Sequence, residues 1–135
     1  MVPTTGTELE MKYILMAYTS KTDWETVDYE SPEFLAMCQF YEDLGKELTE
    51  TGEFVATEGL ADPSFTRTVR RSDSGPVASD GPYAEFKEVL ASFAIVDVAN
   101  HDRAMEIAGR VAQTTGDAIE VRPIPGEPPS DVSSA

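Results

Sequence analysis

The ionisable side chains best placed to do chemistry gather in one short stretch, Ser79–Glu88, with the sequence SDGPYAEFKE. Its first part favours a tight turn: the Asp80 side chain can hydrogen-bond the following backbone, Gly81 allows unusual backbone angles, and Pro82 fixes its own φ angle. A carboxylate at the mouth of a cleft can act as a general base when burial raises its pKa. Asp80 is therefore the candidate base; the alternative is a turn with solvated charges.

A second carboxylate, Glu58, is the candidate partner of Asp80, because two carboxylates that share a site shift each other's pKa. Two tyrosines, Tyr18 and Tyr83, are candidate hydrogen-bond donors, although Tyr18 also suits simple core packing. The predicted ligand-binding residues are Tyr18, Gly81, Pro82, Tyr83, Glu85 and Lys87.

The sequence lacks the residues that several other kinds of catalytic or metal site require. Cys38 is the single cysteine and His101 the single histidine, which excludes an intrachain disulfide, a cysteine metal cluster and a paired-histidine zinc site. Patterns typical of serine hydrolases, dinucleotide binding and P-loops are absent. We predict no metal and no cofactor. Cys38 lies beside an apolar helix face and is expected to be a small buried hydrophobe.

Composition and charge narrow the class of protein. The chain has 135 residues, enough for one domain with a real core, and 41% of them are hydrophobic. A net charge of −15 argues against nucleic acid or an anionic membrane surface as a partner. The longest apolar runs are about eight residues, too short to span a bilayer. The first ten residues lack the features of a secretory signal, so a cytoplasmic location is expected.

The chain shows an ordered series of short elements. Strands are predicted over residues 11–18, 54–57, 65–71, 76–79, 89–98 and 118–122, where β-branched and aromatic residues cluster or alternate. One helix is expected between Ser31-Pro32 and Gly52, and another between Asn100 and Gly116, each with a capping residue and a glycine stop. Residues 19–30 are expected to form a polar loop.

The two ends differ from the body of the chain. Residues 1–10 are polar and are predicted to be a flexible extension. Residues 125–135, PGEPPSDVSSA, are rich in proline and serine and are predicted to be disordered. The domain itself is expected to span residues 11–124.

The element order is that of an α+β fold, a ferredoxin-like split βαβ with an extra hairpin. In this fold the helices cover one face of the sheet. The first and fifth strands are apolar on both faces, so the second face needs another cover. The same face of a second copy is the simplest cover, which predicts a two-fold homodimer.

Four motifs resemble the YCII-related family: Met11-Lys12-Tyr13, Glu58-Gly59-Leu60, Asp80-Gly81-Pro82-Tyr83 and Val121-Arg122-Pro123. The third, with Ala84-Glu85 and Lys87-Glu88 after it, is similar to the DGPF motif of one subgroup. The resemblance implies a dimeric α+β barrel with a pocket between helices and sheet, near this loop and the dimer interface. If Met11 is the family's usual start, residues 1–10 are an extension or a misassigned start.

The chain also departs from the family. Tyr83 replaces phenylalanine, and Ala91-Ser92 replaces a common Gly-Gly. Many members carry a histidine on the first helix, proposed to work with an aspartate; Tyr41 stands near that position here, so the pair cannot be carried over.

Two functions follow from these observations. The first is a dimeric protein that binds an unknown small molecule, or an enzyme that uses carboxylate acid–base chemistry, with its pocket at the DGPY loop. The alternative is a non-catalytic regulatory or accessory protein that binds a basic protein partner. The resemblance links that alternative to extracytoplasmic-function sigma factor systems, because DGPF-type genes often lie beside their genes.

Overall fold

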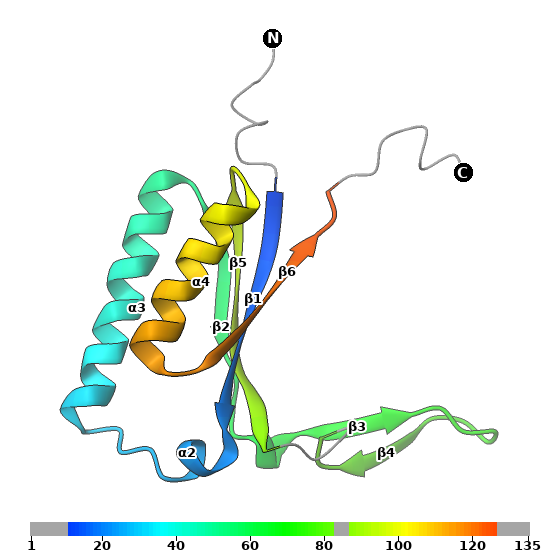
Figure 1. The fold of residues 1–135 in the computed structure, drawn as a ribbon. Helices are drawn as coiled ribbons and strands as arrows, with labels where there is room; N and C mark the ends of the chain where they lie inside the picture. The colour runs from blue at the N-terminus through cyan, green and yellow to red at the C-terminus, as the bar shows by residue number, and fades with distance from the viewer. Residues whose placement is uncertain (1–10, 83–86, 127–135) are drawn as a thin grey trace, which may run out of the picture.

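A four-stranded antiparallel sheet carries the fold of this computed structural model, which describes residues 11–82 and 87–126. The strand order is β2-β5-β1-β6, with β1 Met11–Ser20, β2 Phe54–Gly59, β5 Glu88–Val98 and β6 Ala118–Ile124. Two long helices, α3 Pro32–Thr51 and α4 His101–Thr115, cover one face of the sheet (Figure 1). The ferredoxin-like α+β fold predicted from the sequence is confirmed.

A two-stranded hairpin, β3 Arg67–Arg70 and β4 Val77–Asp80, forms a separate small sheet. It projects from one end of the main sheet, on the side away from the helices (Figure 1). A short 3-10 turn, η1 Pro63–Phe65, precedes it. The strand begins at Arg67 rather than at residue 65 because Asp62 caps this turn, accepting a 2.8 Å hydrogen bond from the Ser64 amide.

The helices begin and end where the capping residues predict. Ser31 accepts a hydrogen bond from the Phe34 amide at 3.1 Å, and Asn100 accepts one from the Arg103 amide at 2.9 Å. Each helix stops at a glycine in the left-handed region, Gly52 with φ 83° and Gly116 with φ 79°. These local signals are sufficient to set both helices.

The core lies between the helices and the covered face of the sheet. Every second residue of β1, namely Tyr13, Leu15 and Ala17, is buried there. The rest of the buried cluster comes from both helices and β5: Leu44, Leu48, Val96, Val98, Ala104, Ile107, Ala108 and Val111.

Two expectations were wrong. The predicted loop over residues 19–30 contains a short helix, α2 Lys21–Glu25, because Ser20 caps it by accepting from the Asp23 amide at 2.9 Å. Cys38 is exposed, not buried, because it lies beside the apolar stripe of α3 rather than on it. Residues 1–10, Tyr83, Glu85 and 127–135 lie outside the described residues, so the predictions on them stay predictions. No helix in the described ranges has the length and apolar character needed to cross a membrane.

Glu53 joins three elements at the end of α3. Its amide donates to the Leu48 carbonyl, and its carbonyl accepts from the Asp97 amide of β5, both at 2.8 Å. Its buried carboxylate accepts two hydrogen bonds from the Arg103 guanidinium of α4, Nε–H to Oε2 at 2.9 Å and Nη2–H to Oε1 at 2.8 Å. This bidentate pair holds α4 against the junction of α3 and β2.

We expect Glu53→Gln to lower the free energy of unfolding by about 1–3 kcal/mol, since a buried charge pair loses one partner while Arg103 keeps Glu106 and Glu47. The Arg103 hydrogen bonds hold the pKa of Glu53 below its usual value. This stabilisation is therefore complete above the ordinary glutamate pKa and is lost as the pH falls through the lower native pKa.

Urea unfolding of both proteins across this pH range measures the effect, with the exposed Glu50→Gln as the control. A difference between wild type and Glu53→Gln that does not shrink in acid would contradict this role of the carboxylate.

Candidate functional site

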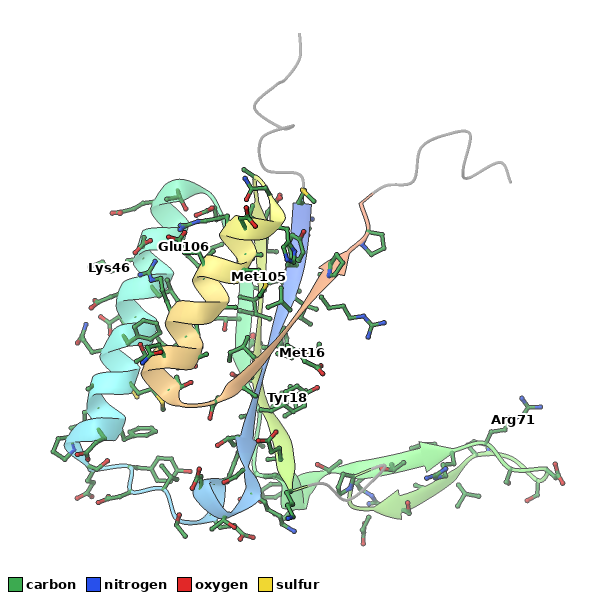
Figure 2. The ribbon with its side chains drawn as sticks, in the orientation of Figure 1. Met16, Tyr18, Lys46, Arg71, Met105 and Glu106 are labelled. Atoms are coloured by element: carbon green, nitrogen blue, oxygen red, sulfur yellow. The ribbon has the colours of Figure 1, made fainter. Side chains whose placement is uncertain are left out.

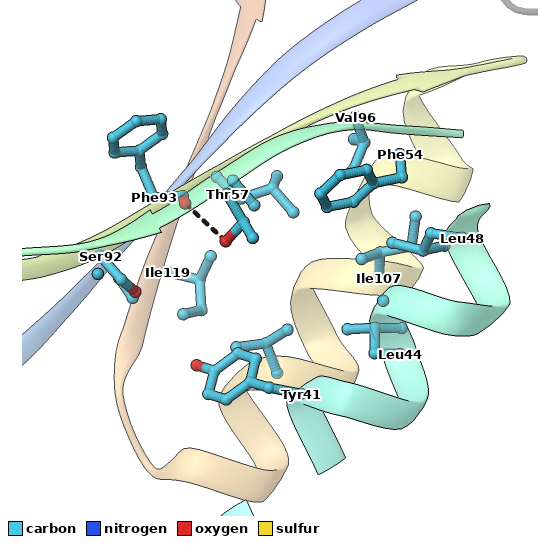
Figure 3. A pocket seen from close by; sticks show the side chains of 16 residues that line it. Tyr41, Leu44, Leu48, Phe54, Thr57, Ser92, Phe93, Val96, Ile107 and Ile119 are labelled. Carbon is cyan, nitrogen blue, oxygen red and sulfur yellow. Dashed lines mark hydrogen bonds between the residues drawn. The ribbon is translucent and has the colours of Figure 1, made fainter. Parts of the chain in front are cut away.

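A mostly apolar cavity of about 260 Å³ lies between the covered face of the sheet and the two long helices (Figure 3). Its volume is close to the lower limit of ordinary small-molecule pockets, roughly 300 Å³. No charged side chain lines it among the described residues. The lining comprises Leu15, Ala17, Tyr41, Leu44, Gly45, Leu48, Phe54, Thr57, Gly59, Ser92, Phe93, Ala94, Val96, Ile107, Val111 and Ile119.

The sheet leaves this space open because one row across β2, β5 and β1 carries only small residues, before it reaches Ile119 of β6. Gly59 of β2 pairs with Ser92 of β5, and Ser92 pairs in turn with Ala17 of β1. Side chains at paired positions share one face of a sheet, so the three stand side by side under the helices. Larger residues in this row would fill the space.

Gly45 supplies the open space on the helix side. It lies in the middle of α3, where glycine costs about 0.5–1 kcal/mol relative to alanine. A Cβ built at Gly45 meets nothing within 4 Å. Close packing is therefore not the reason for a glycine here, and because Gly45 lines the cavity, a larger side chain at this position would enter the open space beside it.

An outer hollow adjoins the cavity between α3 and the edge strand β2. The two hollows share Tyr41, Gly45, Phe54 and Thr57. The outer hollow also has charged side chains on α3, namely Glu42, Lys46 and Glu50. A molecule that reaches the cavity from this side passes Gly45.

Three hydroxyls are the polar side-chain groups of the described lining. Thr57 Oγ1 is already used, since it donates to the Phe93 carbonyl at 3.0 Å. Tyr41 projects from α3 toward Ser92 and Ile119 (Figure 3). The Tyr41 and Ser92 hydroxyls have no hydrogen-bond partner among the described residues, so both remain able to bind a ligand.

An acidic group lies near the Tyr41 end. Partial burial, and then the negative charge of Asp117, raise the pKa of Tyr41, which keeps its phenol neutral. The pKa of Asp117 is itself raised, first by burial and then by the charges of Asp23 and Glu88. The charged groups that raise the pKa of these two residues are thus carboxylates.

Of the predicted loop residues that the structure describes, Asp80, Gly81, Pro82 and Lys87 do not line this cavity. Asp80 ends β4 with its side chain 92% exposed, 3.4 Å from the Arg67 guanidinium. Gly81 has φ 93°, and its amide donates to the Thr66 carbonyl at 2.8 Å, which closes the hairpin. Pro82 is exposed, as is Lys87, whose carbonyl accepts from the Lys21 amide at 2.8 Å.

Glu58 and Tyr18 belong to the second face of the main sheet, the one that the helices do not cover. Glu58 is exposed and pairs with Phe93, whose ring points away from the helices (Figure 3). The Tyr18 hydroxyl donates to Glu120 Oε1 at 3.4 Å. Burial and this neighbouring carboxylate raise the pKa of Tyr18. Neither residue lines the cavity.

The cavity residues were missed because their types carry no chemical signature. Small residues such as Gly45 and Ala94 belong to no reactive motif, and they meet only when the strands and α3 come together. The signal that could have found Gly45 is its place inside a strongly predicted helix, since glycine disfavours helix interiors. No group of three or more metal-ligating side chains occurs within the part of the chain that the structure describes.

Comparisons with known proteins give a family and no activity. The sequence profile of the YCII-related domain family matches residues 11–126. An uncharacterized protein of Rhizobium meliloti (strain 1021) is 34% identical over 92 residues, which cover 63% of this chain and 73% of that protein.

We expect Gly45→Ala to raise the free energy of unfolding by about 0.5–1 kcal/mol, because alanine favours the helix and its Cβ enters open space. Chemical denaturation measures the change. Gly52→Ala is the opposite case, because a left-handed φ of 83° disfavours any side chain. This variant should have a lower free energy of unfolding than the wild type. A loss of stability in Gly45→Ala would show that the helix wall has no spare room.

Proposed function

Since the chain belongs to the YCII-related domain family, we propose that it is a small-molecule-binding protein whose ligand occupies the cavity between α3 and the sheet. The observation that carries this proposal is Gly45, a glycine inside a helix that keeps a cavity wall open at a cost in helix stability. A domain under selection for packing alone gains by filling such a space.

The character of the cavity supports the same proposal. Small-molecule sites are concave and mostly apolar, with a few polar groups that fix the ligand's orientation. This cavity has an apolar wall, two hydroxyls without partners in the described part of the chain, and an adjoining hollow at its edge. The adjoining hollow gives a ligand a route from solvent.

The finer sequence predictions remain part of the proposal as alternatives. Membership of the DGPF subgroup rests on Asp80-Gly81-Pro82-Tyr83, and a catalytic role for Asp80 and Glu58 needs a ligand at that loop. The sheet pairing of Glu58 and the ion pair of Asp80 put the two carboxylates on different sheets. A ligand at the DGPY loop would therefore have to bridge the hairpin and the main sheet.

We also propose that the protein is a homodimer that packs through the second face of the sheet. Figure 1 shows no helix on this face. Four half-buried apolar side chains stand on it: Ile14, Met16, Phe93 and Ile95. Their cross-strand pairs, Ile14 with Ile95 and Met16 with Phe93, make one continuous apolar strip. A two-fold axis would place this strip against its own copy.

The projecting hairpin supports a second copy as the occupant. An isolated two-stranded hairpin is marginally stable in water, and this one exposes apolar side chains on or next to its strands. Phe65 is 78% exposed and Val69 is 65% exposed. Arg71 lies toward the far end of the hairpin (Figure 2), whereas the second face of the main sheet carries the acidic Glu58 and Glu120. A partner chain would cover the hairpin and satisfy this charge.

We expect Gly45→Phe to weaken the binding of naphthalene at least about tenfold, since the new ring occupies the cavity. Chemical-shift changes in a titration followed by NMR measure the affinity. The matched control is Gly109→Phe, at an exposed glycine of α4 where an added Cβ also meets nothing within 4 Å.

Asp80→Asn separates the two locations of the site. Unchanged binding in this variant, with loss in Gly45→Phe, places the ligand in the cavity. Loss in Asp80→Asn with full binding in Gly45→Phe would move the site to the DGPY loop and overturn the proposed cavity site.

We expect Met16→Glu to convert the dimer into monomers, because it buries a charge in the apolar strip beside Glu120. Sedimentation or native mass spectrometry reports the mass. Met105→Glu is the matched control, since this methionine lies on α4, at the helical side of the sheet, and is 46% exposed (Figure 2). A monomeric wild-type protein would refute the dimer.

A further inference from the structure

The polar groups of the cavity are concentrated at one end. Leu44, Leu48 and Ile107 line the middle and far part, while the Tyr41 and Ser92 hydroxyls lie across from each other beside Ile119 (Figure 3). A ligand that fills the apolar part and ends at these hydroxyls needs one polar end group. Neither hydroxyl has a hydrogen-bond partner among the described residues, so a ligand group that pairs with them gains hydrogen bonds at no cost to the protein's own.

The sign of the local charge decides which end groups fit. No charged side chain lines the cavity among the described residues, so an anionic end group finds no cation there. Asp117 lies two residues before Ile119, which lines this end, and its negative charge raises the pKa of Tyr41. A carboxylate brought to this end would lose its hydration and meet like charge. A hydroxyl meets no such penalty, and an amine is attracted.

The cations of the described residues lie outside the cavity lining. Lys21 and Lys87, which stand near Asp23 and Glu88 in the sequence, line neither hollow. Arg103 and Arg110 of α4 form ion pairs with Glu53 and Glu47. Lys46 belongs to the outer hollow, where Glu42 and Glu50 stand one helical turn before and after it. The charges that line the outer hollow therefore sum to a negative value as well.

We propose that the cavity selects compact, mostly apolar molecules whose single polar end group is uncharged or cationic, and that it discriminates against carboxylates and phosphates. This inference rests on the proposed function and adds the chemical class of its ligand. Tyr41 and Ser92 hold the end group by hydrogen bonds, and Asp117 supplies the discrimination by charge.

The test compares compounds that differ only in the end group: 2-naphthylmethanol, 2-naphthylmethylamine and 2-naphthoate, with naphthalene as the reference. Calorimetric titration of the full chain at pH 7 gives the four affinities. We expect the alcohol and the amine to bind at least about tenfold more tightly than the carboxylate, a difference of 1.4 kcal/mol.

Two variants assign the effect to residues. Tyr41→Phe should weaken the binding of the alcohol about 2- to 10-fold, because one hydrogen bond is lost, and leave the affinity for naphthalene unchanged. Asp117→Asn should reduce the ratio of the amine's affinity to the carboxylate's affinity and leave the affinity for naphthalene unchanged. Tyr29→Phe and Asp73→Asn, at exposed positions that line neither hollow, are the matched controls.

The outcomes distinguish this inference from the proposed function. Equal affinities for the alcohol and the carboxylate, both lost in Gly45→Phe, would overturn the selectivity and leave the cavity as the binding site. If Asp117→Asn leaves the ratio of amine affinity to carboxylate affinity unchanged, the role of Asp117 is overturned. Failure of all four compounds, naphthalene included, would overturn the proposed function and the inference with it.

Discussion

The buried ion pair between Glu53 and Arg103 determines how the helices sit on the sheet. Glu53 follows the glycine that ends α3, and its main chain binds both that helix and β5, while its carboxylate binds α4. A carboxylate at this depth is tolerated because Arg103 and the Thr51 hydroxyl, which donates at 2.7 Å, satisfy it. One residue thus relates both helices to an inner strand of the sheet.

A second bidentate pair keeps the two helices at a set distance. Arg110 of α4 donates to both oxygens of Glu47 on α3, at 2.8 and 2.9 Å. Glu47 and Leu48 precede Glu53, whereas Gly45 and Tyr41 lie further back along α3. The ion pairs therefore hold the two helices together along the same part of α3 whose Leu44, Gly45 and Leu48 line the cavity. Charged contacts on the outside and open space on the inside thus belong to one stretch of the helix.

The two faces of the sheet present different groups of side chains. The face under the helices holds the core and the cavity, while the other face holds an apolar strip and the residues Tyr18 and Glu58. Successive side chains of β1 point to opposite faces, with Leu15 and Ala17 on the covered face and Met16 and Tyr18 on the other (Figure 2). Ligand binding and self-association, as proposed, then use opposite surfaces of the same strands.

The sequence by itself determined the element order, the helix ends and the fold class, because caps, glycine stops and the period of apolar residues act over a few neighbours. It also led to the correct family through short motifs. The bulge between Ala17 and Tyr18 and the exposure of Cys38 needed the packed chain, whereas the short helix after β1 has a local cap in Ser20 that was missed in the sequence. The cavity was decided only by the tertiary structure. Gly45, Ala17, Gly59 and Ser92 are separated along the chain and unremarkable in type, and they enclose a space only because strand register and the Glu53 junction bring them together.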